Sequence, residues 1–281
     1  MCATCGCGRA EDTHQHADGT VHSHGHDHHD HGHEHSHGHE HDHSHPHNHS
    51  HPHDHSHPHD HDRKGETIRL EREVLERNDR LAERNRGFLA ARHVLALNLV
   101  SSPGAGKTTL LERTIRDAGR ELGIEVIEGD QETSADADRI RAAGAQAVQI
   151  NTGTGCHLDA AMVAGAFARL KLPLRSTLLI ENVGNLVCPA LFDLGERAKV
   201  VVASVTEGED KPLKYPHMFR ASAVLVLNKI DLLPHVRFDV DRFLANARQV
   251  NPRQTVFQVS ATRGDGLADW YGWLREQRAA A

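Results

Sequence analysis

Residues 101–109 have the types and spacing of a phosphate-binding loop. They read Ser-Ser-Pro-Gly-Ala-Gly-Lys-Thr-Thr, after an apolar run and before a helical pattern, which is the context such a loop needs. Glycines let backbone N–H groups turn toward phosphate oxygens, and the helix N-terminus adds partial positive charge. Lys107 would reach the β and γ phosphates, and the Thr108 hydroxyl would bind Mg²⁺. The expected phosphate site comprises Gly104, Ala105, Gly106, Lys107, Thr108 and Thr109.

One position departs from the general pattern of these loops. Ser101 stands where a glycine is usual, five places before Gly106. The alternative to a phosphate loop is a glycine turn that binds no ligand, but the strand before it and the helix after it favour the phosphate loop.

The sequence Asn228-Lys229-Ile230-Asp231 follows another apolar run and matches the NKxD element of guanine-nucleotide-binding proteins. A carboxylate at Asp231 accepts from the ring N–H and the exocyclic amine of guanine, whereas adenine would leave the charge unpaired. Ser260 and Ala261, in Ser-Ala-Thr after a further apolar run, fit the remaining guanine-contacting loop. We therefore expect GTP and GDP as the ligands, bound through Asn228, Lys229, Asp231, Ser260 and Ala261.

Two acidic positions are candidates for Mg²⁺ and for the attacking water. Asp130 follows the apolar run at 124–129, and Glu181 lies at the end of the run at 176–182. Carboxylates at such places hold the waters of Mg²⁺ or orient the nucleophile. With Lys107 and Thr108 they form the expected catalytic group for GTP hydrolysis. The alternative is that either acid caps the helix that follows it.

The five cysteines fall into two groups. Cys2, Cys5 and Cys7 form a terminal CxxCxC, and the terminal amine could add a fourth donor. Soft thiolates suit Zn²⁺, Cu⁺ or Ni²⁺, and an S₃N set that can flatten favours Ni²⁺ without excluding zinc. A thiol cluster without a ligand is the alternative.

Cys156-His157 and Cys188 form the second group, on two loops that each follow a predicted strand. Two thiolates and one imidazole are too few to close a structural zinc site, so water or a second copy of the domain would complete the shell. This predicts a labile or shared metal site. A satisfied histidine beside two buried cysteines is the alternative.

Residues 22–61 hold 21 of the 27 histidines and no aliphatic, aromatic, alanine or cysteine residue. Such a segment has nothing to bury, so we expect a disordered tail. Neutral imidazoles at this density bind divalent ions weakly and interchangeably, which favours storage over a purification tag. The segment up to Asp62 carries a net charge of about −10, which leaves about +3 for the rest of the chain of 281 residues.

The remaining chain has the length of one folded domain. Residues 66–92 show apolar rows every seven residues, which predict a helix packed on its own domain rather than a coiled coil. Beyond it, short apolar runs alternate with helical patterns, which predicts an α/β fold with a mostly parallel sheet and helices on both faces. The predicted strands are 94–100, 124–129, 147–150, 176–182, 199–205, 222–228 and 255–261, with a last helix at 266–278.

No secretory signal or membrane-spanning run is visible, so we expect a cytoplasmic protein. An odd number of cysteines in a reducing compartment favours metal binding over disulfides. No nucleic acid and no membrane are expected as partners. The predicted organisation is a CxxCGC motif at 1–8, a histidine-rich tail at 9–65 and a GTPase domain at 66–281.

The motifs together resemble the HypB family, SIMIBI-class P-loop GTPases that deliver nickel to [NiFe]-hydrogenase. They are the terminal CxxCGC, the histidine tail, LVSSPGAGKTTLLE, GDQETSADADRI, NTGTGCHLDA, ENVGNLVCPA, TEGEDKPLKYP and NKIDLL. The resemblance implies a homodimer formed on GTP or metal binding, with a HypA-like nickel/zinc protein and the hydrogenase large subunit as partners. It makes Cys2, Cys5 and Cys7 the tight nickel site. It makes Cys156, His157 and Cys188 the nickel or zinc site of the GTPase domain.

Two rival functions stay open at this level. The urease nickel GTPase also carries a histidine tail but in general lacks the terminal CxxCGC. A nickel or zinc store with a vestigial GTPase fold would not need an intact Lys107, Thr108 and NKID. A GTP hydrolysis assay separates the store from the enzyme.

Overall fold

The structure, a computed structural model, describes residues 13–15, 21–23, 61–131 and 135–281 and divides into two units, 1–65 and 66–281. In the first unit β1 (Thr13–Gln15) pairs antiparallel with β2 (Val21–Ser23). No structure is expected there from the sequence, but a short hairpin needs only backbone hydrogen bonds and no apolar core, although it is marginally stable by itself. The CxxCGC motif and most of the histidine tail lie outside the described residues.

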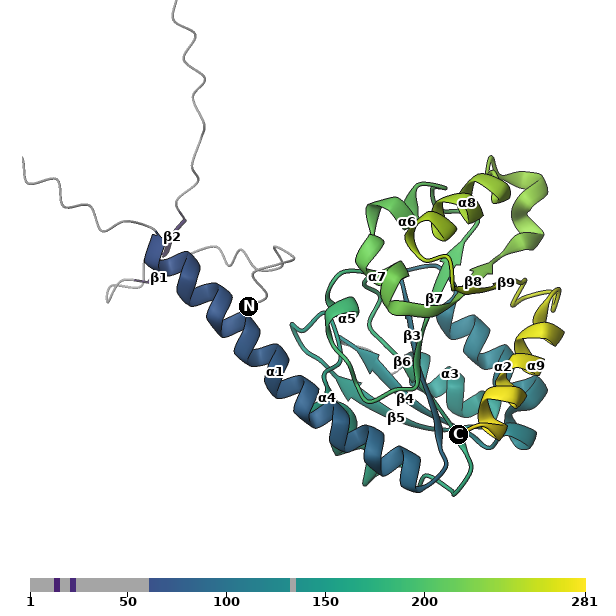
Figure 1. Cartoon of the computed structure of the whole chain (residues 1–281), viewed down its shortest axis with the longest axis horizontal. Coiled ribbons are helices and arrows are strands. Elements are labelled where there is room, and N and C mark those ends of the chain that lie inside the picture. Colours follow the sequence, from purple (N-terminus) through teal and green to yellow (C-terminus); the bar gives the residue numbers. More distant parts are fainter. Residues whose placement is uncertain (1–12, 16–20, 24–60, 132–134) are drawn as a thin grey trace, which may run out of the picture. The chain divides into compact units, whose positions relative to one another are not determined.

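The second unit is built on a seven-stranded sheet whose strand order is β5-β4-β6-β3-β7-β8-β9. Every neighbouring pair is parallel, which confirms the predicted fold class. Figure 1 shows the sheet between layers of helices. Its strands are β3 (Leu95–Ser101), β4 (Ile124–Asp130), β5 (Gln146–Asn151), β6 (Thr177–Glu181), β7 (Ala198–Ser204), β8 (Ser222–Asn228) and β9 (Thr255–Gln258).

Nine α-helices and one 3₁₀-helix are assigned within the described residues. They are α1 (His61–Ala91), α2 (Lys107–Leu122), α3 (Ala135–Ala143), α4 (Ala160–Phe167), α5 (Cys188–Leu191), α6 (Lys211–Lys214), α7 (Pro216–Ala221), η1 (Ile230–His235), α8 (Val240–Val250) and α9 (Leu267–Ala279).

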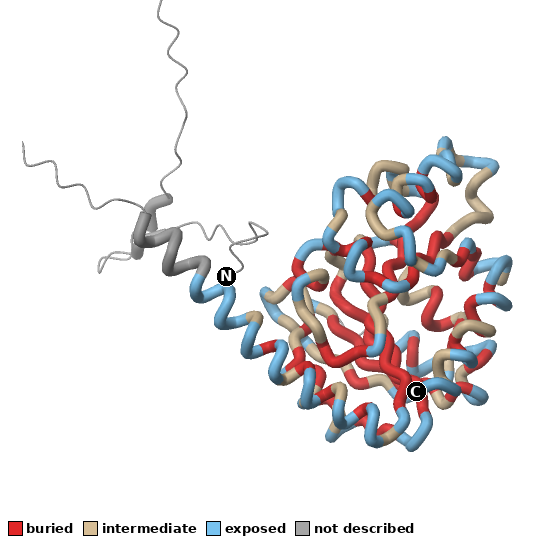
Figure 2. Tube along the Cα trace, in the orientation of Figure 1, coloured by how far each residue is buried: buried red, intermediate tan, exposed pale blue. Residues whose placement is uncertain are grey.

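Alternate residues of the strands enter different cores, as the two-residue period of a strand requires. Leu95, Leu97 and Leu99 of β3 pack in a cluster that contains residues of α2, α3 and α9. The intervening positions face the other side, where Ala96 packs beside α1 and α4, and Val100 packs beside α7 and α8. Figure 2 shows the resulting buried centre along the strands. Both faces of the sheet are therefore covered, which explains why the strands read as nearly continuous apolar runs.

Helix α1 packs on its own unit through its C-terminal half. Of the two predicted apolar rows, the one with Ala82 and Leu89 has both of these residues buried, whereas Val74 and Phe88 of the other row are 55% and 41% exposed. The predicted packing against the domain is therefore confirmed for Ala82 and Leu89, whereas Phe88 lies at the edge of the contact, where it stacks on Phe167 of α4 at 5.0 Å between ring centroids. The reason is that buried polar residues of α1, Asn78 and Asn85, take part in the contact and shift the packed face.

The last strand is shorter than predicted. β9 ends at Gln258, and Ser260 and Ala261 lie in the loop that follows. The loop forms because Ser260 N–H donates to Asp265 O and Gly264 N–H donates to Ser260 O, which turns the chain away from the sheet. None of the helices that the structure describes is long and apolar enough to cross a bilayer.

Candidate functional site

The phosphate loop connects β3 to α2 at the carboxyl end of the sheet, where ligands bind in such folds. Gly106 has φ 91°, and a Cβ built on it would lie 2.6 Å from Asn228 Nδ2, so only glycine fits there. Ser101 is the last residue of β3 and is buried, and its Oγ donates to Ser102 O at 2.7 Å. Because this position has ordinary strand geometry, the serine in place of glycine costs the loop no strain.

Lys107 and Thr108, the first residues of α2, point at the end of β6. Lys107 Nζ lies 2.8 Å from Glu181 Oε1, and Thr108 Oγ1 lies 2.6 Å from the same oxygen. Asp136 Oδ2 is 3.2 Å from the Thr108 hydroxyl. Glu181 Oε2 is buried and has no hydrogen-bond partner among the described residues. The buried Glu181 carboxylate and the neighbouring Thr108 hydroxyl are oxygen ligands of the kind that Mg²⁺ prefers.

Asp130, the remaining expected catalytic residue, and Thr109 of the expected phosphate site make other contacts. Asp130 ends β4, and its Oδ1 accepts from Gln131 N–H at 2.7 Å. Thr109 Oγ1 lies 3.5 Å from Arg139 Nη2 of α3. Thr109 therefore faces α3 rather than the carboxylates.

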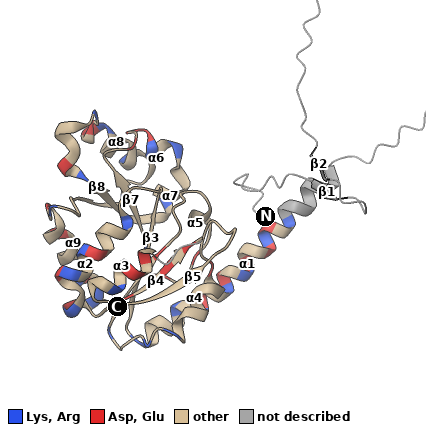
Figure 3. Cartoon of the chain, turned by 180° about the vertical axis from the view of Figure 1, so that it is seen from behind, with Lys and Arg blue, Asp and Glu red and all other residues tan. Residues whose placement is uncertain are grey.

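Glu128 is a buried acid that the sequence analysis missed. It lies in β4 directly beside Glu181 of β6, and its Oε2 has no hydrogen-bond partner among the described residues. Burial, together with the charges of Glu181, Asp130 and Asp136, raises the pKa of Glu128 to about 8. In Figure 3 the red colour marks acidic positions along β4 and α3. The sequence signal for this cluster is the pair of acids Glu128 and Asp130, two residues apart in the largely apolar strand β4.

This raised pKa predicts how stability depends on pH. Between pH about 4.5 and 8 the unfolded chain loses the Glu128 proton and the folded chain keeps it, so the free energy of unfolding falls as pH rises. Glu128→Gln should flatten this fall and stabilise the protein at pH 8 by on the order of 2 kcal/mol, with little effect at pH 4.5. The measurement is urea unfolding across this range without nucleotide or divalent ions. Parallel curves for variant and wild type would contradict it. Glu76→Gln, an exposed acid of α1, is the control.

The NKxD residues hold the phosphate loop and the base loop together. Asn228 Nδ2 donates to Ala105 O at 3.1 Å, and Asn228 Oδ1 accepts from Ala261 N–H at 3.1 Å. Lys229, with a left-handed φ of 63°, donates from Nζ to Gly104 O at 2.7 Å. Asn228 and Lys229 therefore build the site by fixing backbone.

Asp231 and Ser260 complete the base end. Asp231 Oδ1 is buried and has no hydrogen-bond partner among the described residues. Ser260 is fully buried, and its Oγ accepts from Arg263 N–H at 3.0 Å. Because a desolvated carboxylate oxygen without a partner is costly, a ligand that donates N–H groups would stabilise Asp231.

The predicted GTPase-domain metal ligands come together. The ligand atoms of Cys156, His157 and Cys188 lie within 4.8 Å of one another, and the two Sγ atoms are 3.0 Å apart. Burial lowers the pKa of His157 against the opposing effect of Asp159, which favours the neutral imidazole that metals bind. His157 also packs on the Phe192 ring at 4.0 Å between centroids. Both cysteines are buried, so their thiols are shielded from solvent.

Hydrogen bonds fix the loops that carry these ligands. Thr152 Oγ1 donates to Gly155 O at 2.8 Å within the first loop. Asp159 caps α4 by accepting from Met162 N–H at 2.8 Å, which sets the chain direction just after His157. Asn185 Nδ2, at 3.4 Å from Cys156 O, joins the loop of Cys188 to that of Cys156.

A parallel sheet with this loop after its first strand defines a P-loop nucleotide-binding protein. Residues 95–258 match the CobW/HypB/UreG nucleotide-binding domain. The chain is 59% identical over 213 residues to hydrogenase maturation factor HypB of Escherichia coli, which covers 76% of this chain and 73% of that protein. The chain belongs to the HypB family of P-loop GTPases.

Two solved structures agree with this assignment. HypB of Archaeoglobus fulgidus has 41% identity and a TM-score of 0.68, with 72% of this chain and 99% of that chain covered. HypB of Helicobacter pylori, solved in complex with nickel, has 38% identity and a TM-score of 0.69, with 73% and 96% covered.

Proposed function

We propose that this protein is a GTP-hydrolysing nickel metallochaperone that delivers Ni²⁺ during [NiFe]-hydrogenase maturation. The observation that carries the proposal is the segment from Glu181 to Cys188, which is only eight residues long. Its first residue contacts Lys107 and Thr108 of the phosphate loop, and its last residue contacts Cys156. A change at the phosphate end of so short a segment reaches the metal cluster directly.

In this proposal Lys107 and the backbone of Gly104, Ala105 and Gly106 bind the phosphates of GTP. Thr108, Asp130 and Glu181 would hold Mg²⁺. When bound there, Mg²⁺ would neutralise the charge that develops on the phosphates. Glu181 Oε2 is buried and has no hydrogen-bond partner in the described part of the chain, which supports that role. Asp231 reads guanine, and Thr109, Ser260 and Ala261 complete the nucleotide pocket.

The metal sites are proposed to act in sequence. Cys2, Cys5 and Cys7 hold nickel tightly, and Cys156, His157 and Cys188 form a labile site for nickel or zinc. Three ligands leave a coordination position open, and a second copy of the chain could fill it. The exposed apolar residues beside Cys188, Val187 and Leu191, support a homodimer that closes over this face.

The further partners proposed are a HypA-like nickel/zinc protein and the hydrogenase large subunit. We propose that they meet this protein in the cytoplasm, because a reducing compartment keeps the thiols of Cys156 and Cys188, only 3.0 Å apart, from forming a disulfide. A GTPase and nickel-transfer assay with a purified large subunit tests this set of roles. Transfer that needs no GTP would contradict it.

Deleting residues 22–61 should separate storage from the proposed chemistry. The deletion should lower the number of Ni²⁺ ions bound per chain but leave one tight thiolate site and the GTPase rate unchanged, because neither draws on that segment. Equilibrium dialysis and a phosphate-release assay measure the two quantities. Loss of the tight site with the tail would contradict the proposal.

In the full chain, acidification should release the ions held by the tail as the imidazoles protonate near pH 6.5.

A further inference from the structure

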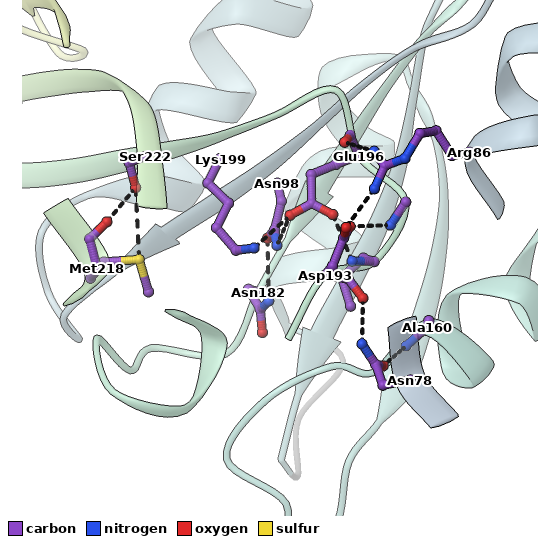
Figure 4. A network of polar contacts seen from close by, with 12 residues as sticks. Asn78, Arg86, Asn98, Ala160, Asn182, Asp193, Glu196, Lys199, Met218 and Ser222 are labelled. Carbon is purple, nitrogen blue, oxygen red and sulfur yellow. Dashed lines mark hydrogen bonds and ion pairs between the residues drawn. The ribbon is translucent and has the colours of Figure 1, made fainter. Parts of the chain in front are cut away.

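A buried asparagine, Asn182 (Figure 4), directly follows Glu181, which contacts Lys107 and Thr108 of the phosphate loop. Its Nδ2 donates to Asn98 Oδ1 at 3.2 Å. Its Oδ1 accepts from Leu158 N–H at 3.1 Å and from Val183 N–H at 3.0 Å. Leu158 is the residue after His157, so the Asn182 side chain contacts the backbone of the metal-binding segment, and Asn182 itself adjoins Glu181 in sequence.

The orientation of this amide is fixed by a buried charge. Glu196 is 5% exposed, and its Oε1 accepts from Lys199 Nζ at 3.0 Å and from Asn98 Nδ2 at 3.1 Å. Because a carboxylate only accepts, Asn98 must turn its oxygen toward Asn182. Asn182 then presents its nitrogen to Asn98 (Figure 4) and its oxygen to the Leu158 N–H.

On the nucleotide side the segment around Asn182 fits tightly against the phosphate loop. Asn182 N–H donates to Leu99 O at 3.0 Å. A Cβ built on Gly184 would lie 3.1 Å from Pro103 Cγ of the loop. A shift of the phosphate loop or of Glu181 on nucleotide exchange therefore moves this segment.

On the metal side the Leu158 side chain packs on β4. A Cβ built on Gly129 would lie 2.7 Å from Leu158 Cγ, and Gly129 stands between Glu128 and Asp130. Leu158 is thus held at its backbone by the hydrogen bond to Asn182, and its side chain packs against Gly129, between the two acids of β4. Both contacts come from the carboxyl ends of β4 and β6, on the side of the proposed nucleotide site.

We propose that Asn182 is the positioning residue through which the nucleotide state sets the geometry of Cys156, His157 and Cys188. This inference rests on the proposed nucleotide-dependent metal binding. Metal and nucleotide affinities must then change each other by the same factor, typically about 5- to 150-fold. Removing the amide of Asn182 should reduce that factor toward one.

Asn78 provides a matched control. It is also a buried asparagine, and its Oδ1 accepts from Ala160 N–H at 2.9 Å, two residues after Leu158. Its Nδ2 donates to Asp193 O at 2.7 Å, so it holds the same segment from α1 and not from the nucleotide site. Asn78→Ala loosens the segment without interrupting the Asn182 contact.

The experiment uses the full chain with Cys2, Cys5 and Cys7 replaced by serine, so that nickel-thiolate absorption reports only Cys156 and Cys188. Ni²⁺ affinity is measured in a chelator-buffered titration with GDP and with a non-hydrolysable GTP analogue. Asn182→Ala should bring the ratio of the two affinities to within about two-fold of one. Asn78→Ala should keep the ratio of the parent.

Four outcomes decide the matter. If the difference in Ni²⁺ affinity between the two nucleotide states is lost in Asn182→Ala and kept in Asn78→Ala, the inference is supported. If the difference is kept in Asn182→Ala, or lost equally in both variants, the inference is overturned but the proposed function stands. If the parent protein binds Ni²⁺ equally well in both nucleotide states, nucleotide-dependent metal binding is overturned, and the inference with it.

A second measurement needs no variant and decides the case if Asn182→Ala does not fold. Amide hydrogen exchange at Leu158 in the parent chain should differ between GDP and the GTP analogue, because its N–H is held by Asn182. Equal exchange in the two states overturns the inference.

Discussion

Asp231→Asn should weaken GTP binding by about 2–4 kcal/mol and shift preference toward xanthosine nucleotides. Asp231 Oδ1, which is buried and has no partner among the residues that the structure describes, is the acceptor that guanine N–H groups would satisfy. An asparagine presents one oxygen and one N–H group, so it loses one acceptor and pairs instead with the extra carbonyl of xanthine. Calorimetric titration with GTP and with xanthosine triphosphate measures both affinities.

The control for this prediction is Asp241→Asn, an exposed acid in α8. It should leave both affinities unchanged. GTP affinity that is equal in Asp231→Asn and wild type would rule out the guanine assignment.

Cys188→Ala should abolish nickel-thiolate absorption from the GTPase domain and weaken Ni²⁺ binding there by at least about 100-fold. Even changes to the partners of metal ligands typically cost 10- to 100-fold, and Cys188 is proposed as a ligand itself. The measurement is the same chelator-buffered titration, on the chain that lacks Cys2, Cys5 and Cys7. GTP hydrolysis without nickel should be retained.

His217→Ala is the matched control, because His217 is an exposed histidine outside the cluster. It should leave nickel affinity and absorption unchanged. Undiminished absorption in Cys188→Ala would remove this cysteine from the site.

Much of the fold follows from local pattern. The strands are buried on both faces, so their apolar runs stand out in the sequence, and the glycine loop and NKID mark where two of them end. The boundaries of β9 did not follow, because Ser260 and Asp265 turn the chain through backbone hydrogen bonds that leave no apolar signature. The packed face of α1 was only half predicted, because Asn78 and Asn85 are polar and yet buried.

The site shows a similar division. Motif spacing was enough to find Lys107, Asp231 and the Cys156 cluster, because each carries its chemistry in a recognisable side chain. Glu128 was missed because its role depends on the neighbouring strand, which places it beside Glu181. The role proposed for Asn182 could not be predicted, since it depends on contacts with Asn98 and Leu158, which are 84 and 24 residues away in sequence.

The most direct test of nickel delivery driven by GTP is a single-turnover experiment on the chain that lacks Cys2, Cys5 and Cys7. The protein is loaded with Ni²⁺ and GTP in the presence of a colorimetric nickel chelator, and phosphate release and nickel-thiolate absorption are followed together. The proposed function predicts that the absorption decays at the rate of phosphate release and persists with a non-hydrolysable GTP analogue. Nickel that stays bound through hydrolysis, or leaves equally fast with the analogue, would contradict it.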